Sequence, residues 1–139
     1  MSLIIGIDYG LKRIGLSYAE TPLFIAHALA TIRNNELFSY LTEYNKNKTI
    51  EKIVIGEPKS LDGTSTDITE KVNQLKKKLE NNFPKIDIVL YDERFTSKIA
   101  MQSMVIGGFK KKERRKKGNI DEISAVIILR DYLMKNKGL

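Results

Sequence analysis

The segment LIIGIDYGLKRIGLSYAE, residues 3–20, contains the strongest structural pattern in this chain. Its first part, Leu3–Asp8, is a nearly unbroken apolar run, which is typical of a strand buried on both faces of a sheet. Residues 10–13 predict a tight turn, and Ile14–Glu20 predicts the antiparallel partner of the first strand. Because a strand buried on both faces belongs in the interior of a sheet, more strands and covering helices are expected downstream.

Outside this hairpin, short apolar runs predict strands, and apolar residues three or four apart predict helices. Asn34 or Asn35, and later Thr96 or Ser97, are the expected helix caps. Pro58 ends the strand before it because proline cannot continue a ladder. The predicted strands are Ala26–Ile32, Ile50–Gly56 and Ile86–Tyr91, and the predicted helices are 34–44, 68–79, 96–106 and 120–135. The expected fold is therefore a mixed α/β sheet flanked by helices, in a single domain over residues 1–139.

The composition excludes several classes of protein. The 139 residues suffice for one domain, and 42% hydrophobic with 29% charged residues is ordinary for a globular chain. The sequence has no cysteine, which excludes disulfides, thiolate nucleophiles and thiolate metal sites. No apolar run approaches the roughly 18 residues of a membrane span, and the N-terminus does not resemble a signal peptide. We expect a cytoplasmic protein that does not bind membranes.

A basic segment lies between Gly107 and Gly118. It has seven basic residues and one acid, Glu113, and so carries +6 of the formal net charge of +7. Such a run repels itself and favours a polyanionic partner, of which the phosphate backbone of nucleic acid is the obvious example. The alternatives are a solvated loop or a membrane-surface patch, but the segment has almost no apolar face for a membrane. Nucleic acid is the expected partner.

Acidic residues stand where the predicted strands end. Asp8 closes the first strand, Glu57 the fourth, and Asp92 and Glu93 the fifth, while Asp121 opens the last helix. In sheets of this kind, functional groups gather at the carboxyl ends of the strands. Carboxylates that converge there would repel one another unless a cation lay between them, and Mg²⁺ or Mn²⁺ prefers such oxygen ligands. Two such ions can activate a water and stabilise the leaving oxygen of a phosphodiester.

Each of these acids also has a structural explanation. Asp8 could simply begin a turn, although it follows a buried run where a bare carboxylate is costly. Asp121 suits the dipole of the helix start, where Asn119 and Glu122 could form a capping box. Asp92 and its neighbour point to opposite sides of a strand, so one of the two is a ligand and the other structural.

Four blocks of the sequence resemble motifs of the YqgF/RuvX family of Holliday junction resolvases and pre-16S rRNA nucleases. The first is IDYGLKRIG at 7–15, and the second is IGEP at 55–58 with LDGT at 61–64. The third is DERFTS at 92–97, and the fourth is the basic segment followed by DEISAVIIL at 121–129. The blocks follow the family order and span nearly the whole chain.

The resemblance implies an RNase H-like fold with a five-stranded sheet. It implies catalytic, metal-binding acids at Asp8, Glu93 and Asp121, and a role in trimming the 5′ end of precursor 16S rRNA. One departure is Glu57, where the family usually has an apolar residue. Glu57 is a candidate additional metal ligand, because related resolvases have an acid near the end of this strand. Alternatively it faces solvent or pairs with a basic neighbour such as Lys59 or Arg94.

Several residues are expected to hold the substrate. Gly10 leaves room for a close approach to the strand end, and Arg13 is suited to bidentate phosphate contacts. His27, the only histidine, is expected to be structural, and Tyr9 to pack more than to stack on a base. The predicted substrate-binding residues are Gly10, Lys12, Arg13, Arg94, Lys111, Lys112, Arg115 and Lys116.

Other functions remain open at this stage. A Holliday junction resolvase on branched DNA would share the chemistry but needs two active sites and hence a dimer. A non-catalytic nucleic-acid-binding factor would gain nothing from clustered acids. A nucleotide-binding ATPase would need a second domain to close on the nucleotide. We expect an endonuclease dependent on Mg²⁺ or Mn²⁺ that acts on structured RNA as a monomer or weak homodimer.

Overall fold

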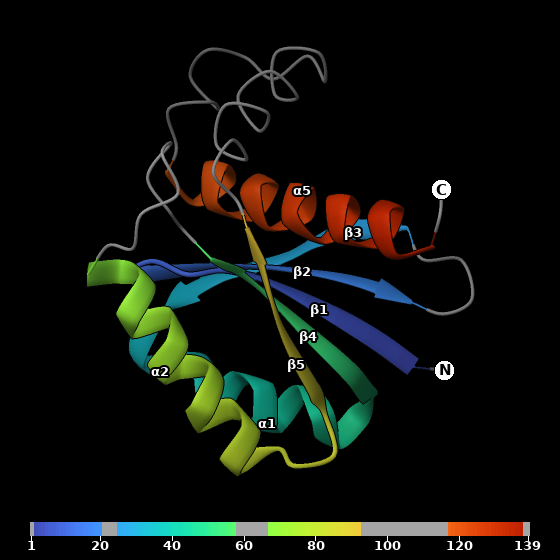
Figure 1. The fold of residues 1–139 in the computed structure, drawn as a ribbon, viewed down its shortest axis with the longest axis horizontal. Helices are drawn as coiled ribbons and strands as arrows, with labels where there is room; N and C mark the ends of the chain where they lie inside the picture. Colours follow the sequence, from blue (N-terminus) through green and yellow to red (C-terminus); the bar gives the residue numbers. More distant parts are fainter. Residues whose placement is uncertain (1, 21–24, 58–66, 93–116, 138–139) are drawn as a thin grey trace.

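The computed structural model describes residues 2–20, 25–57, 67–92 and 117–137. The described chain forms one five-stranded sheet with helices on both faces (Figure 1). In chain order the elements are β1 (Ser2–Asp8), β2 (Arg13–Glu20), β3 (Ala26–Arg33), the 3-10 helix η1 (Asn34–Glu36), α1 (Leu37–Asn47), β4 (Thr49–Glu57), α2 (Asp67–Asn82), β5 (Asp87–Asp92) and α5 (Lys117–Lys137).

The strand order in the sheet is β3-β2-β1-β4-β5. β1 pairs antiparallel with β2 and parallel with β4, and β4 pairs parallel with β5. The predicted hairpin and the interior position of its first strand are therefore confirmed, as is the mixed five-stranded sheet. β1 is buried on both faces between neighbours, which explains its apolar run.

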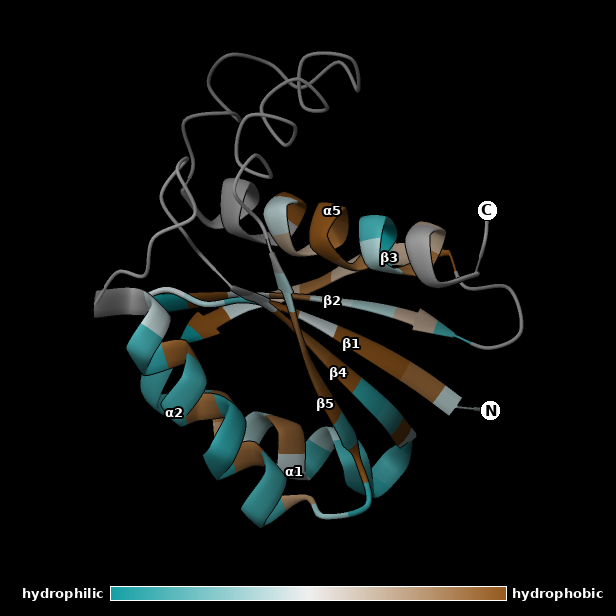
Figure 2. Ribbon diagram, in the orientation of Figure 1, coloured by the Kyte–Doolittle hydropathy of each residue, from teal (hydrophilic) through white to brown (hydrophobic). Residues whose placement is uncertain are grey.

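The first layer of the core lies between the sheet and helices α1 and α2. Both helices turn an apolar face to the strands, while their outer faces are hydrophilic (Figure 2). The predicted apolar face of α2 is confirmed, since Val72, Leu75 and Leu79 are buried there. The main buried side chains of this layer are Ile5, Ile7, Ile14, Leu16, Leu37, Leu41, Ile53, Ile55, Val72 and Leu79.

The second layer lies between the other face of the sheet and α5. Side chains from β1, β2 and β4 meet one side of this helix, in a cluster that comprises Ile4, Ala19, Val54, Ile128, Leu129, Tyr132 and Leu133. Gly6 allows the closest approach, because a Cβ built on it would fall on Ser17 Oγ and 2.9 Å from Leu129 Cβ. Ser17 donates a buried hydrogen bond to the Ala125 carbonyl oxygen at 2.7 Å.

Two local expectations were wrong. Neither η1 nor α1 has a side-chain cap, so Asn34 and Asn35 do not cap a helix there. Helix α5 begins at Lys117, three residues before the predicted start, which puts Asn119 inside the helix instead of at a capping box. Asp121 consequently follows the first turn, whose residues include no acid. The helix predicted over 96–106 lies outside the described residues.

The opposite end of β4 is tied to the C-terminal half of α5. The Lys52 ammonium donates to the Tyr132 hydroxyl at 2.8 Å and lies 3.6 Å from Asp87 Oδ2. The hydrogen bond to Tyr132 is the main reason that the pKa of Lys52 is raised. In the described part of the chain, no helix has the length and apolar character needed to span a membrane.

Candidate functional site

The carboxyl ends of β1, β4 and β5 lie at one edge of the sheet, on the side where α5 begins (Figure 1). These strands end at Asp8, Glu57 and Asp92. The register pairs Glu57 of β4 directly with Asp92 of β5. It also pairs Ile7 of β1 with Ile55 of β4, so Asp8 lies one residue beyond the Ile7–Ile55 pair. The structure therefore brings three of the predicted acidic positions together at the same edge.

The start of α5 lies over the same edge. A Cβ built on Gly6 would come within 3.1 Å of the Ala125 carbonyl oxygen, so β1 and α5 are in contact at this level. Asp8 lies two residues further along β1, about 6.6 Å, on the same face as Gly6. Asp121 precedes Ala125 by about one helical turn, or about 6 Å. Because α5 runs antiparallel to β1, both steps lead in the same direction and bring positions 8 and 121 to one level.

The three predicted catalytic acids differ in how much the structure says about them. The side chain of Asp8 is described and is partly buried. Only the backbone of Asp121 is described, and Glu93 lies outside the described residues. Among the described side chains no group of three acids or imidazoles forms a metal-binding cluster. The donors themselves suit a hard divalent cation, which prefers carboxylate oxygens, and the assignment of the three acids stays a prediction.

The described neighbours of the acids at this edge pack in two different layers. Ile55 packs in the layer of α1 and α2, and Glu57 follows it by two residues. Tyr91, which directly precedes Asp92 on β5, packs in the α5 layer. The side chains of Glu57 and Asp92 are not described.

The turn between β1 and β2 is held by the residue that was expected to cap a helix. Asn34 donates from Nδ2 to the Gly10 carbonyl oxygen at 2.8 Å, and from its backbone N–H to the Lys12 carbonyl oxygen at 2.9 Å. A Cβ on Gly10 would fall on the carbonyl oxygen of Arg13. The turn itself therefore requires glycine here, whether or not a phosphate approaches it, and Lys12 and Arg13 extend from a fixed loop.

A basic groove of about 650 Å³ runs beside this turn. Its charged lining residues are Lys12, Arg13 and Arg33, and no acid lines it among the described residues. Arg33 was not predicted from the sequence. Its place in the groove follows from the strand register, which puts Arg33 of β3 directly opposite Arg13 of β2. Three cations that line one groove favour the binding of an anion there.

The remaining predictions divide into confirmed and untested ones. Tyr9 is partly buried and packs against the core, as expected. His27 is exposed on β3, with its ring centroid 5.3 Å from that of Tyr18. The other predicted substrate-binding residues lie outside the described residues: Arg94, Lys111, Lys112, Arg115 and Lys116.

Comparison with known proteins gives consistent results. A family model described as "RuvX: Holliday junction resolvase" matches residues 2–135. A protein of Amoebophilus asiaticus is 43% identical over 137 residues, which cover 99% of this chain and 97% of that protein. One of Christiangramia forsetii is 42% identical over 133 residues, with 96% and 98% covered. Both carry the name "Putative pre-16S rRNA nuclease".

Two solved structures share the fold. Thermus thermophilus RuvC, in complex with a Holliday junction substrate, has a TM-score of 0.61 at 15% identity, with 98% of this chain and 97% of that chain covered. The fowlpox virus resolvase in its complex with Holliday junction DNA has a TM-score of 0.58 at 10% identity, with 97% and 98% covered. At these identities the likeness shows the fold alone, and it confirms the expected RNase H-like architecture.

Proposed function

Because this chain belongs to the RuvX family, we propose that it is a metal-dependent endonuclease that hydrolyses phosphodiesters in structured RNA. Its proposed substrate is precursor 16S rRNA, and its proposed task is processing of the 5′ end in the cytoplasm. The observation that carries the proposal is the common level of Asp8 and position 121 at the edge where β1, β4 and β5 end. The names of the relatives support the choice of rRNA.

Asp8, Glu93 and Asp121 would hold the metal ions. When bound, Mg²⁺ or Mn²⁺ at such a site supplies a water activated as nucleophile and offsets negative charge on the leaving oxygen. The protein's own contribution would be positional. β1 and α5 bring positions 8 and 121 to one level, and Glu93 directly follows β5 in the sequence.

Basic residues would hold the substrate beside these acids. Lys12 and Arg13 line the groove beside the turn that follows β1, and an arginine fork there can bind a phosphate through two hydrogen bonds. Arg94 directly follows the proposed ligand Glu93. Phosphates further away would be neutralised by Lys111, Lys112, Arg115 and Lys116, which precede Asp121 in the sequence. Gly10 gives the backbone of the turn its close approach to Arg13.

A second candidate function is resolution of Holliday junctions. It is favoured by the description of the family and by the fold shared with two resolvases. Such an enzyme must cut a two-fold symmetric junction at two places, and therefore has to act as a dimer. A non-catalytic nucleic-acid-binding role is disfavoured, because clustered acids weaken the binding of phosphates. The expected monomer or weak homodimer fits the RNase role better.

One comparison tests the proposal. Wild type and Asp8→Asn are incubated with precursor 16S rRNA and with a four-way DNA junction, each with EDTA, Mg²⁺ or Mn²⁺. We expect cleavage of the rRNA precursor near its mature 5′ end by wild type with metal, and none by the variant. Cleavage by the variant at the wild-type rate would remove Asp8 from the site. Symmetric cutting of the junction alone would instead establish the resolvase.

A further inference from the structure

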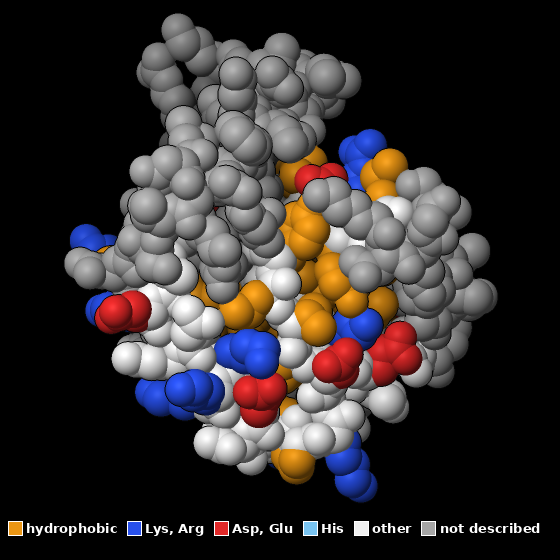
Figure 3. Space-filling model, in the orientation of Figure 1, with side chains coloured by type: hydrophobic (Ala, Val, Ile, Leu, Met, Phe, Trp, Pro, Cys, Tyr) orange, Lys and Arg blue, Asp and Glu red, His pale blue; other side chains and the backbone are white. Residues whose placement is uncertain are grey.

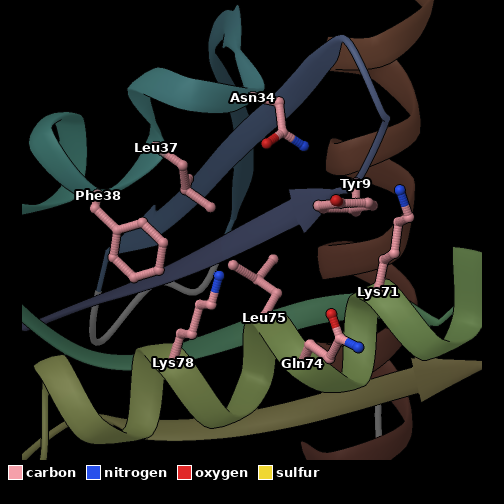
Figure 4. Close-up of a pocket in the computed structure, with 8 residues that line it drawn as sticks. All are labelled: Tyr9, Asn34, Leu37, Phe38, Lys71, Gln74, Leu75 and Lys78. Atoms are coloured by element: carbon pink, nitrogen blue, oxygen red, sulfur yellow. The ribbon is translucent and has the colours of Figure 1, made fainter.

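A second hollow lies on the opposite face of the sheet from α5, between α2 and the segment formed by η1 and α1. Its volume is about 240 Å³, below the roughly 300 Å³ at which pockets for drug-sized ligands begin. Figure 4 shows that its lining comes from three places: the end of β1, η1 with α1, and α2. The lining residues are Tyr9, Asn34, Leu37, Phe38, Lys71, Gln74, Leu75 and Lys78.

Two lysines of α2 give this pocket its charge. Lys71 and Lys78 are two helical turns apart, about 10 Å along the axis, and both line the pocket. Among the described residues, neither ammonium forms an ion pair, and no acid lines the pocket. On the same helix Lys76 is paired with Glu80 at 3.1 Å. On the face drawn in Figure 3, Lys and Arg side chains are interspersed with Asp and Glu.

The pocket also offers flat and hydrogen-bonding surfaces. The Tyr9 ring packs against the core but stays partly exposed, and it lies at one end of the pocket, near Lys71 (Figure 4). Leu37, Phe38 and Leu75 contribute apolar surface. The Gln74 amide has no hydrogen bond to another described residue, and it presents both a donor and an acceptor. An aromatic ring, an amide and two cations around a small hollow suit one planar base with its flanking phosphates.

The pocket is connected to the proposed active site through the chain itself. Tyr9 directly follows Asp8, and consecutive residues of a strand point to opposite faces. Asn34 lines both this pocket and the basic groove of Lys12, Arg13 and Arg33. A nucleic acid strand that crosses the sheet edge beside Asp8 would therefore meet the groove and the pocket in succession.

We propose that the pocket between α1 and α2 binds one unpaired base of a single-stranded nucleic acid, which stacks on Tyr9 while Lys71 and Lys78 hold its phosphates. This deepens the proposed function, on which it rests, by naming single-stranded RNA next to the cut as the form that the enzyme recognises. A duplex cannot supply such a base without unpairing it, and exposed bases of single strands bind by stacking on aromatic rings.

The test measures binding without cleavage. Affinities of the full chain for a fluorescent single-stranded RNA and for a duplex of the same sequence are measured by anisotropy in EDTA. The test variant is Lys71→Ala with Lys78→Ala, and the matched control is Lys77→Ala with Lys85→Ala, which removes the same charge from exposed positions. We expect the test variant to lose about tenfold more single-strand affinity than the control, and to bind duplex as the control does. Equal losses in both variants, or equal losses for both nucleic acids, would overturn the proposal.

A cross-link locates the base independently of affinity. Single-stranded RNA with one 5-iodouracil is irradiated on the wild-type protein, and the linked peptide is identified by mass spectrometry. The expected cross-link is to Tyr9, and a reproducible cross-link that avoids residues 9–12 and 71–78 would contradict the proposal. Neither measurement requires catalysis. A protein that passes both but cleaves nothing with metal would keep the base pocket and lose the proposed nuclease function.

Discussion

Ser17 on β2 donates a hydrogen bond from Oγ to the carbonyl oxygen of Ala125 on α5, across 108 residues of sequence and at 2.7 Å. The hydroxyl occupies the space that a side chain at Gly6 would fill, because Ser17 and Gly6 are register partners. This contact fixes the distance of α5 from the sheet. It therefore also determines how close the start of α5 comes to the end of β1, where two of the proposed metal ligands stand.

Gly6→Ala should destabilise the protein by about 1–3 kcal/mol, as overpacking of a tight core does. The new methyl group would overlap Ser17 Oγ and lie 2.9 Å from Leu129 Cβ, so these buried groups would have to shift. Ser17→Ala alone should cost about 1 kcal/mol for the lost hydrogen bond. In the double variant the two costs should not add, because part of the clash disappears with the hydroxyl. Urea unfolding of the four proteins measures this coupling, and strict additivity would show that the two residues do not share this space.

Glu93→Gln should abolish cleavage, whereas Glu57→Gln should cost at most about 10–100-fold in rate, the effect of a supporting residue near a metal. The reason is the family resemblance, which implies a metal-binding acid at Glu93, whereas the family usually has an apolar residue at the position of Glu57. Single-turnover cleavage rates of both variants at saturating Mg²⁺ decide the matter. Near-complete loss in both would make Glu57 a metal ligand.

Neutralising the basic segment should weaken binding to every nucleic acid tested without changing the cleavage rate at saturating substrate. Phosphate contacts act through counterion release, so the salt dependence should become shallower by about 3 in logarithmic slope for four lost charges. The variant changes Lys111, Lys112, Arg115 and Lys116 to Gln, and the control changes Lys46, Lys48, Lys77 and Lys85. Coinciding salt slopes for the variant and the wild type would show that this segment does not hold phosphates.

The ion pair at the far end of β4 should make the protein sensitive to alkali. The hydrogen bond from Lys52 to Tyr132 raises the pKa of the ammonium above its ordinary value of 10.5, so the charged form is favoured in the folded state. The contribution of the charged Lys52 to the free energy of unfolding is fully present below pH 10.5. It is lost as the pH rises through the pKa that Lys52 has in the folded protein.

The matched variant for this prediction is Lys52→Met, which cannot titrate. Wild type should be more stable than the variant by about 1 kcal/mol near pH 8, and the difference should shrink above pH 10.5. Tyr40 and Tyr44 also have a raised pKa, mainly through burial, and they destabilise both proteins alike at high pH. A stability difference that stays constant up to pH 11.5 would contradict the assignment.

The hairpin and the apolar strands could be predicted because their signals are local. A run such as Leu3–Asp8 indicates a buried interior strand whatever surrounds it. Asn34 shows the limit of this reasoning. Its position before an apolar-periodic segment is typical of a cap, but its amide instead holds the Gly10 turn, which lies 24 residues earlier. Such a contact depends on how β3 pairs with β2, and nothing near Asn34 in the sequence specifies it.

The acidic positions at the strand ends could also be predicted, since parallel strands share one carboxyl edge. The base pocket could not. Lys71 and Lys78 have the same helical spacing as many solvated lysines, and only the docking of α2 beside η1 separates them from the paired Lys76. Arg33 was missed for a similar reason, because its approach to Arg13 follows from a strand register that the sequence does not state.

The place of α5 at the end of the described chain has a consequence for synthesis on the ribosome. β1 emerges first, yet the face that carries Gly6 stays uncovered until residues 125–133 have been made. A nascent chain thus holds Asp8 without the helix that brings Asp121 to it. A chain truncated at residue 116 should accordingly bind a hydrophobic dye strongly and cleave nothing.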